Sequence, residues 1–114
     1  MLQGIDNKET IEFVSTTDTA ENPTVFLLGN ISNKDKLNLF ADAIDRTGAI
    51  DMSKMSGRIF DIAKAGLKGI KNLSGKDYAT IDDAVLETIP FNVVLELVNK
   101  IVEINFLGVK QEKN

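Results

Sequence analysis

Residues 90–107, PFNVVLELVNKIVEINFL, predict a helix that is apolar around nearly its whole circumference. At about 100° per residue, most of its polar side chains fall in one stripe about 100° wide. The members of that stripe are Asn92, Glu96, Asn99, Lys100 and Glu103. Asn105 is the exception outside it. Such a helix either lies at the centre of the fold, covered by other elements on several sides, or carries a second apolar face that binds another chain.

Two neighbouring apolar seams run along this helix. One contains Phe91, Leu95, Val98 and Val102, and the other contains Val94, Leu97, Ile101 and Ile104. Because one flat layer cannot cover both seams, one of them packs elsewhere in the fold or stays exposed for a partner. If a flank is exposed, we expect a partner to bind Phe91, Leu95, Val102 and Phe106.

The composition bounds the class of protein. With 114 residues, the chain forms one domain, residues 1–114; we expect residues 1–8 and 109–114 to fray. No stretch has the roughly 20 apolar residues of a membrane span, and residues 1–8 lack a signal-peptide pattern, so we expect a soluble protein that is not exported. Cysteine and histidine are absent, which excludes disulfides, catalytic triads with histidine and imidazole metal sites. We therefore expect no enzyme, cofactor or metal.

Two short segments near the N-terminus predict a β-hairpin. Residues 10–15 and 24–29 are rich in β-branched and aromatic side chains, and the polar residues 16–23 separate them. Residues 24–28 are apolar almost without alternation, as in a strand covered on both faces. Ile11 and Phe13 alternate with polar residues, as in an edge strand.

Two helices are predicted in the middle of the chain. The first begins at residue 32 or 33 and ends at Gly48. Its buried stripe contains Leu37, Phe40, Ala41 and Ile44, with Leu39 on the opposite side. The second covers residues 53–73 and has Gly66 within its apolar stripe. A glycine there indicates that another backbone approaches closely, or that the helix bends or breaks near residues 66–69.

The remaining elements complete an α+β fold. Residues 72–79 predict a loop, and Thr80 begins a short helix with Asp83 at capping-box spacing. Ile89-Pro90 ends that helix and begins the last one, because proline is accepted in a first turn. Together the elements predict an N-terminal β-hairpin packed on a small bundle of about four helices, the C-terminal helix central.

Two pairs of carboxylates are the main candidates for chemistry. Asp42 with Asp45, and Asp82 with Asp83, are the residue types that carry acid–base catalysis or hold magnesium. Capping of a helix N-terminus explains Asp82 and Asp83, and a solvated helix face explains the other pair. The sequence therefore predicts no catalytic site at either pair.

The basic residues gather in the second predicted helix. Its candidate docking residues are Lys54, Arg58, Lys64 and Lys68; this face is either simply solvated or binds an acidic partner, a second copy of the chain included. The net charge of -4 argues against a general nucleic-acid binder. Gly66-Leu67-Lys68-Gly69 matches the Gly-x-x-Gly loop of KH domains. That loop needs a second helix directly after it, so single-stranded nucleic acid is a remote alternative.

Several segments resemble small proteins of the structural and morphogenesis gene clusters of tailed bacteriophages. They are residues 23–26 (PTVF), 66–73 (GLKGIKNL), 89–90 with 96–97 and 101–105 (IVEIN), and the ending Lys113-Asn114. The resemblance implies a non-enzymatic virion or assembly protein, such as a tail-assembly chaperone, a connector-region protein or a capsid-associated protein. It implies tail, connector or capsid proteins as partners, a location in the host cytoplasm during assembly or in the virion, and no membrane. A small phage-encoded regulator that binds a host protein is the alternative.

Overall fold

The computed structural model describes residues 1, 8–44, 46–48 and 50–107. Fraying is predicted for residues 1–8 and 109–114; of these, residues 2–7 and 109–114 lie outside the described residues. Asp45, one member of a predicted carboxylate pair, also lies outside them. Within the described part of the chain, none of the helices combines the length and the apolar composition needed to cross a bilayer.

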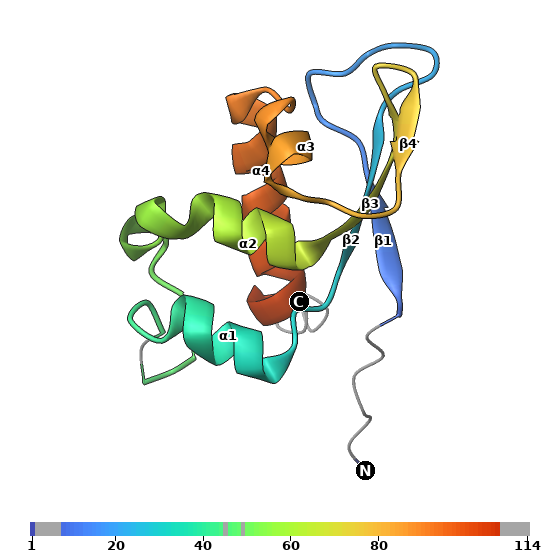
Figure 1. Cartoon of the computed structure of the whole chain (residues 1–114). Coiled ribbons are helices and arrows are strands. Elements are labelled where there is room, and N and C mark those ends of the chain that lie inside the picture. The colour runs from blue at the N-terminus through green and yellow to red at the C-terminus, as the bar shows by residue number, and fades with distance from the viewer. Residues whose placement is uncertain (2–7, 45, 49, 108–114) are drawn as a thin grey trace.

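Four strands form one antiparallel sheet in the order β1-β2-β3-β4. β1 (Thr10–Phe13) pairs with β2 (Val25–Gly29), which confirms the predicted hairpin. β1 lies at the edge of the sheet, as its alternating sequence indicates. β2 is an inner strand whose Phe26 and Leu28 are buried, while Val25 and Leu27 are only half-buried. All the helices lie to one side of this sheet (Figure 1), so only one face of β2 is fully covered.

The predictions of a helix to residue 73 and of a loop after it are wrong. Residues Leu67–Leu73 form β3, which pairs with β2, and Lys76–Tyr78 form β4, which pairs with β3. A β-bulge misled the sequence pattern. Leu28 is opposite Leu67 and Leu27 is opposite Gly69, which leaves Lys68 as the extra residue between them. Leu67 and Ile70 are therefore both buried although they have helical spacing.

The turn between β3 and β4 depends on left-handed backbone geometry. Asn72, Ser74 and Gly75 have φ angles of 63°, 53° and 81°. Asn72 is held in place on both sides, since its backbone N–H donates to Asp77 and its side-chain amide donates to the carbonyl of Asn22, at 2.7 Å. These bonds join the hairpin to the loop between β1 and β2 and offset the strain at Asn72.

Helix α2 (Ile59–Gly66) follows two 3-10 turns, Met52–Lys54 and Ser56–Arg58. It ends at Gly66 because Leu67 is already extended, with φ −89° and ψ 112°. This confirms the predicted break in the helix. A close approach also occurs at Gly66, but through a side chain: a Cβ added there would lie 2.5 Å from Cγ2 of Ile101.

Helix α1 (Asn33–Phe40) begins as predicted, because the side chain of Ser32 accepts a hydrogen bond from the Asp35 N–H. It ends at Phe40, before the predicted Gly48, and its predicted buried stripe is wrong. Leu37 is 66% exposed, while Phe40 is fully buried and Leu39 packs against the core. Ala41 and Ile44, also predicted to be buried, are exposed.

The ring of Phe106 sets the orientation of α1. It packs edge-on against Phe40, with ring centroids 4.8 Å apart, and the Lys36 ammonium lies 5.5 Å from its centroid. The helix therefore faces the core through residues 36, 39 and 40, an i, i+3, i+4 stripe. That stripe turns Leu37 toward solvent.

Two further helices complete the chain. α3 (Asp83–Glu87) is the predicted short helix, with Asp82 rather than Thr80 as its N-cap, because the Asp82 carboxylate accepts from the Val85 N–H at 2.9 Å. α4 (Phe91–Val102) continues into a π-helical turn, Glu103–Leu107, so the helix predicted over residues 90–107 is confirmed. The chain is α+β as predicted, although the sheet has two strands more than expected.

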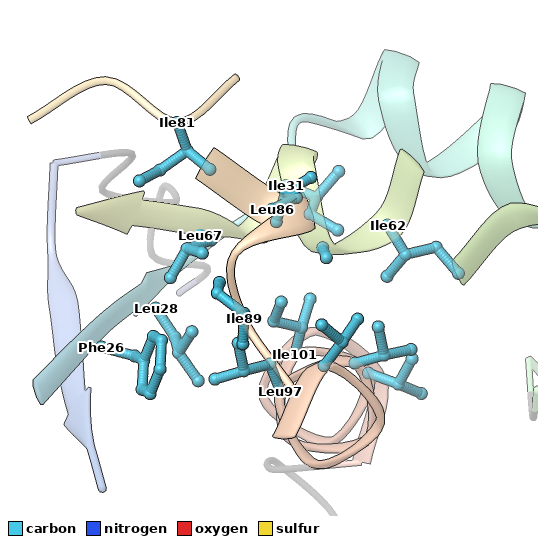
Figure 2. Close-up of a cluster of buried hydrophobic side chains, with 14 of the residues drawn as sticks. Phe26, Leu28, Ile31, Ile62, Leu67, Ile81, Leu86, Ile89, Leu97 and Ile101 are labelled. Atoms are coloured by element: carbon cyan, nitrogen blue, oxygen red, sulfur yellow. The ribbon is translucent and has the colours of Figure 1, made fainter. Parts of the chain in front are cut away.

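α4 packs against both the sheet and α2, as a central helix does (Figure 1). Figure 2 looks nearly along its axis and shows Leu97 and Ile101 among side chains from β2, β3, α2 and α3. The buried residues of α4 span half its circumference: Val93, Val94, Leu97, Val98, Ile101 and Val102. Three of the four residues of the seam with Val94 and half of the seam with Phe91 are therefore buried inside the fold.

Asn105, the polar exception in the sequence of this helix, joins its end to the strand β2. Its side-chain oxygen accepts from the Ile31 N–H at 2.9 Å, and its amide nitrogen donates to the Ile101 carbonyl at 2.9 Å and the Gly29 carbonyl at 3.4 Å. The side chain satisfies backbone groups where the chain leaves the sheet for α1.

Glu96 holds the loop between β1 and β2 against α4. Its carboxylate accepts hydrogen bonds from Ser15 Oγ at 2.5 Å, Thr16 Oγ1 at 2.9 Å and Thr16 N at 3.1 Å. These bonds, the one from Ser15 foremost, hold the pKa of Glu96 below its ordinary value. Ser15 is buried, so its hydroxyl depends on this acceptor.

We expect Glu96→Gln to lower the free energy of unfolding at neutral pH by about 1–2 kcal/mol, because a neutral amide replaces a charged acceptor. The pKa is depressed in the folded state. The contribution of the carboxylate is therefore full above the unfolded pKa of about 4.3 and is lost as the pH falls through the folded pKa. Urea denaturation at neutral pH and at about pH 3 measures this. The two proteins should differ less at the lower pH; an undiminished difference contradicts the assignment, and Glu21→Gln is the matched control.

A candidate protein interface on helices α2, α3 and α4

The structure separates the four apolar residues predicted to bind a partner. Phe91 is 58% exposed and Leu95 is 37% exposed, one turn apart on the same flank of α4. Val102 is only 3% exposed, so its predicted place on a binding flank is wrong: it is part of the core. Phe106 is half-buried because its ring packs on Phe40. The flank is thus available only in the first half of α4.

The four predicted basic residues do not form one docking face. Arg58 caps the C-terminal end of α1: its Nη1 donates to the carbonyls of Leu39 at 2.7 Å and Asn38 at 3.1 Å, and its Nη2 lies 3.2 Å from Asp42. Lys68 lies on β3, where its ammonium donates to the carbonyl of Ala65 at the end of α2. These cations stabilise helix C-termini, where partial negative charge gathers.

The other two predicted basic residues lie on different elements. Lys64 is on α2 and pairs with Asp83 of α3, with Nζ and Oδ1 3.3 Å apart. Lys54 is exposed on the 3-10 turn that precedes α2. Three of the four residues thus serve contacts within the chain. The helix predicted to align all four does not form, because residues 53–73 are divided among two 3-10 turns, α2 and β3.

The Gly-x-x-Gly tetrapeptide does not form a nucleic-acid clamp. Gly66 is the last residue of α2, and Leu67, Lys68 and Gly69 are the first residues of β3, inside the sheet. A Cβ at Gly69 would lie 3.2 Å from Leu27 Cδ1, so the side chain of Leu27 on the neighbouring strand β2 already covers this backbone. The KH-type alternative requires a loop between two helices, and the structure overturns it.

Three exposed apolar side chains mark the candidate interface. Phe60 of α2 is 41% exposed and lines a common hollow with Phe91 of α4, and Leu95 follows Phe91 one turn later; we call these three residues the Phe60 patch. Phe60 and Phe91 line one shallow hollow of about 170 Å³, together with Ile59 and Asp61. Phe60 has the helical spacing of the apolar residues of α2, so only its exposure in the structure identifies it as a candidate contact residue.

A second hollow of about 250 Å³ lies on the other side of Phe60, between α2 and α3. Its walls are Phe60, Asp61, Asp83, Leu86 and Glu87. Asp83 pairs with Lys64, while Asp61 and Glu87 have no ion-pair partner among the described residues. The Phe60 patch is therefore bordered by negative charge on the α3 side.

A third hollow, of about 400 Å³, lies between the β1–β2 loop and the start of α4. It is lined in part by hydroxyl-bearing side chains, and four of them already hydrogen bond within the chain: Ser15, Thr17, Thr24 and Thr88. Thr24 donates to the Asn72 carbonyl, Thr88 donates to the Val85 carbonyl, and Asp18 accepts from the Thr24 N–H. A ligand there would have to displace these hydrogen bonds. We therefore assign the polar groups of this hollow to the stability of the fold rather than to ligand binding.

The three paired carboxylates that the structure describes have structural roles. Asp82 caps α3, and Asp83 and Asp42 form the ion pairs described above with Lys64 and Arg58. In the residues described by the structure, no group of three or more carboxylates lies close enough to hold a metal ion.

Comparisons of the chain with models of protein families, with curated proteins and with solved structures find no match. The candidate interface therefore rests on the geometry and chemistry of this chain alone.

Proposed function

We propose that this chain is a non-enzymatic bacteriophage virion or virion-assembly protein that binds another protein through the Phe60 patch. The observation that supports contact with a protein is the exposure of two phenylalanines and a leucine on adjoining helices. Exposed apolar patches mark sites of association, and aromatic side chains carry much of the binding free energy at such sites. The bacteriophage context is supported by the resemblance of residues 23–26, 66–73 and 101–105.

The hollows beside Phe60 also favour a protein partner over a small molecule. Both are smaller than the roughly 300–1,000 Å³ of typical small-molecule sites, at about 170 and 250 Å³. At about 30 Å³ per water, the larger one has room for roughly eight waters, comparable with one large side chain. Shallow hollows between exposed aromatic residues are suited to side chains from a second surface.

We expect Phe91→Ser to abolish capture of the partner while lowering the free energy of unfolding by less than about 1 kcal/mol, because this side chain is largely solvated. The measurement is a quantitative pull-down from infected cells with the tagged chain, analysed by mass spectrometry, together with mass spectrometry of purified virions. Leu37→Ser, which removes an exposed leucine from α1, is the matched control and should retain the partner.

The outcomes separate the alternatives. Recovery of the chain in virions, or of a tail, connector or capsid protein in the pull-down, supports the proposal. Capture of a host protein that depends on Phe91, together with absence of the chain from virions, would contradict this proposal and support the alternative, a small phage-encoded regulator that binds a host protein. Equal capture by wild type and Phe91→Ser rejects the Phe60 patch as the interface.

A further inference from the structure

The chemistry around Phe60 defines what kind of partner segment fits. The two hollows share Phe60 and Asp61, so an apolar side chain seated against Phe60 lies next to a carboxylate. Glu87 borders the same hollow from α3. A partner segment could carry a lysine or arginine one helical turn, or two residues, away from the apolar residue. The positive charge of that side chain would then meet these carboxylates.

The charges in this region leave a negative excess. Asp61, Asp83 and Glu87 border the larger hollow, and Lys64 is the cation that pairs with one of them. Neither Asp61 nor Glu87 is neutralised by an ion pair in the described part of the chain. An acidic partner would be repelled here, and a basic one would be attracted.

A second copy of this chain fits the surface poorly. The chain carries a net charge of -4, and Arg58, Lys64 and Lys68 are already engaged within the fold. Two copies meeting at this surface would bring Asp61 and Glu87 toward another acidic chain. The charge complementarity therefore favours a different, basic protein.

We propose that the Phe60 patch and the hollow beside α3 bind a basic amphipathic segment of another protein. One apolar side chain of that segment packs between Phe60 and Phe91, and a lysine or arginine pairs with Asp61 and Glu87. This inference rests on the proposed function, since it states which class of protein segment the interface accepts.

The test is an NMR titration of the full ¹⁵N-labelled chain with a synthetic amphipathic helical peptide of leucine and lysine. A second peptide has glutamate in place of lysine. We expect saturable shifts of the amides of residues 56–61, 83–87 and 91–95 with the lysine peptide, and none with the glutamate peptide. The double variant Asp61→Asn, Glu87→Gln should weaken binding of the lysine peptide about tenfold, because its ion pairs with Asp61 and Glu87 are lost.

A matched variant separates specific pairing from attraction to the whole acidic chain. Glu12→Gln with Glu21→Gln removes the same charge from β1 and the β1–β2 loop and should change the affinity less than about twofold. Equal weakening by both double variants, shifts spread over the whole acidic surface, or binding that Phe60→Ser leaves unchanged would each overturn the inference.

The two proposals fail in different ways. A natural partner that is lost from Phe91→Ser but retained by Asp61→Asn, Glu87→Gln leaves the proposed function standing and refutes the basic segment. Saturable peptide binding at the patch, with no virion or phage protein recovered from cells, supports the basic segment and refutes the proposed function.

Discussion

Leu97→Ala is expected to lower the free energy of unfolding by about 3 kcal/mol, within the range of about 2–5 kcal/mol typical of truncating a buried leucine. Leu97 is fully buried on α4, among side chains from the sheet and from α2 (Figure 2). Truncation removes dispersion contacts with several elements at once and leaves a cavity that the surrounding helices and strands cannot fill by a local movement. Chemical denaturation at neutral pH, with the unfolding slope compared between variants, measures the change.

Leu95→Ala is the control for this experiment. It makes the same substitution on the same helix, so any change in helix propensity cancels, but Leu95 is 37% exposed. We expect it to cost less than about 1 kcal/mol. Equal losses for Leu95→Ala and Leu97→Ala would contradict the placement of α4 with one flank in solvent.

Gly66→Val is expected to lower the free energy of unfolding by about 3 kcal/mol, at the upper end of the usual cost of overpacking. Even a single Cβ at Gly66 would lie 2.5 Å from Cγ2 and 2.8 Å from Cδ1 of Ile101. Ile101 is fully buried, so its side chain has no free space to move into. The valine therefore forces α2 and α4 apart where they cross. Thermal and chemical denaturation both report this loss.

A double-mutant cycle identifies the cause. Ile101→Ala alone should cost about 2–5 kcal/mol through its cavity. Together with Gly66→Val it should cost about 1–3 kcal/mol less than the sum of the two single changes, because the valine enters the space that Ile101 vacates. Strict additivity would show that Gly66 does not contact Ile101. Gly57→Ala is the control, since nothing lies within 4 Å of a Cβ there.

Part of the fold follows from local sequence because the responsible interactions are local. The Ser32 cap, the carboxylate cap of α3 and the start of α4 after Pro90 involve residues only a few positions apart. The β1–β2 hairpin likewise follows from two β-prone segments and a polar connection. The residues that form these features can be read along the chain, since each cap joins residues three positions apart and the hairpin pairs two strands that follow one another in the sequence.

The strand β3 shows why other parts could not be predicted. Its bulge at Lys68 buries Leu67 and Ile70 together although they have the spacing of a helix. The choice of a strand is made by pairing with β2, about 40 positions earlier. The orientation of α1 is similar, because it depends on Phe106 near the other end of the chain. Periodicity within a segment carries no information about which distant segment covers it.

The residues of the candidate interface also fall into those that the sequence could identify and those that only the tertiary structure identifies. The sequence alone identified an excess of apolar surface on residues 90–107 and the flank with Phe91 and Leu95, because helical periodicity fixes which side chains share a face. Only the tertiary structure decided that Val102 is buried, that Phe60 is exposed and that Arg58 and Lys68 serve as helix caps. Exposure depends on how α2, α3 and α4 pack together, and that packing is set by contacts between residues far apart in the sequence.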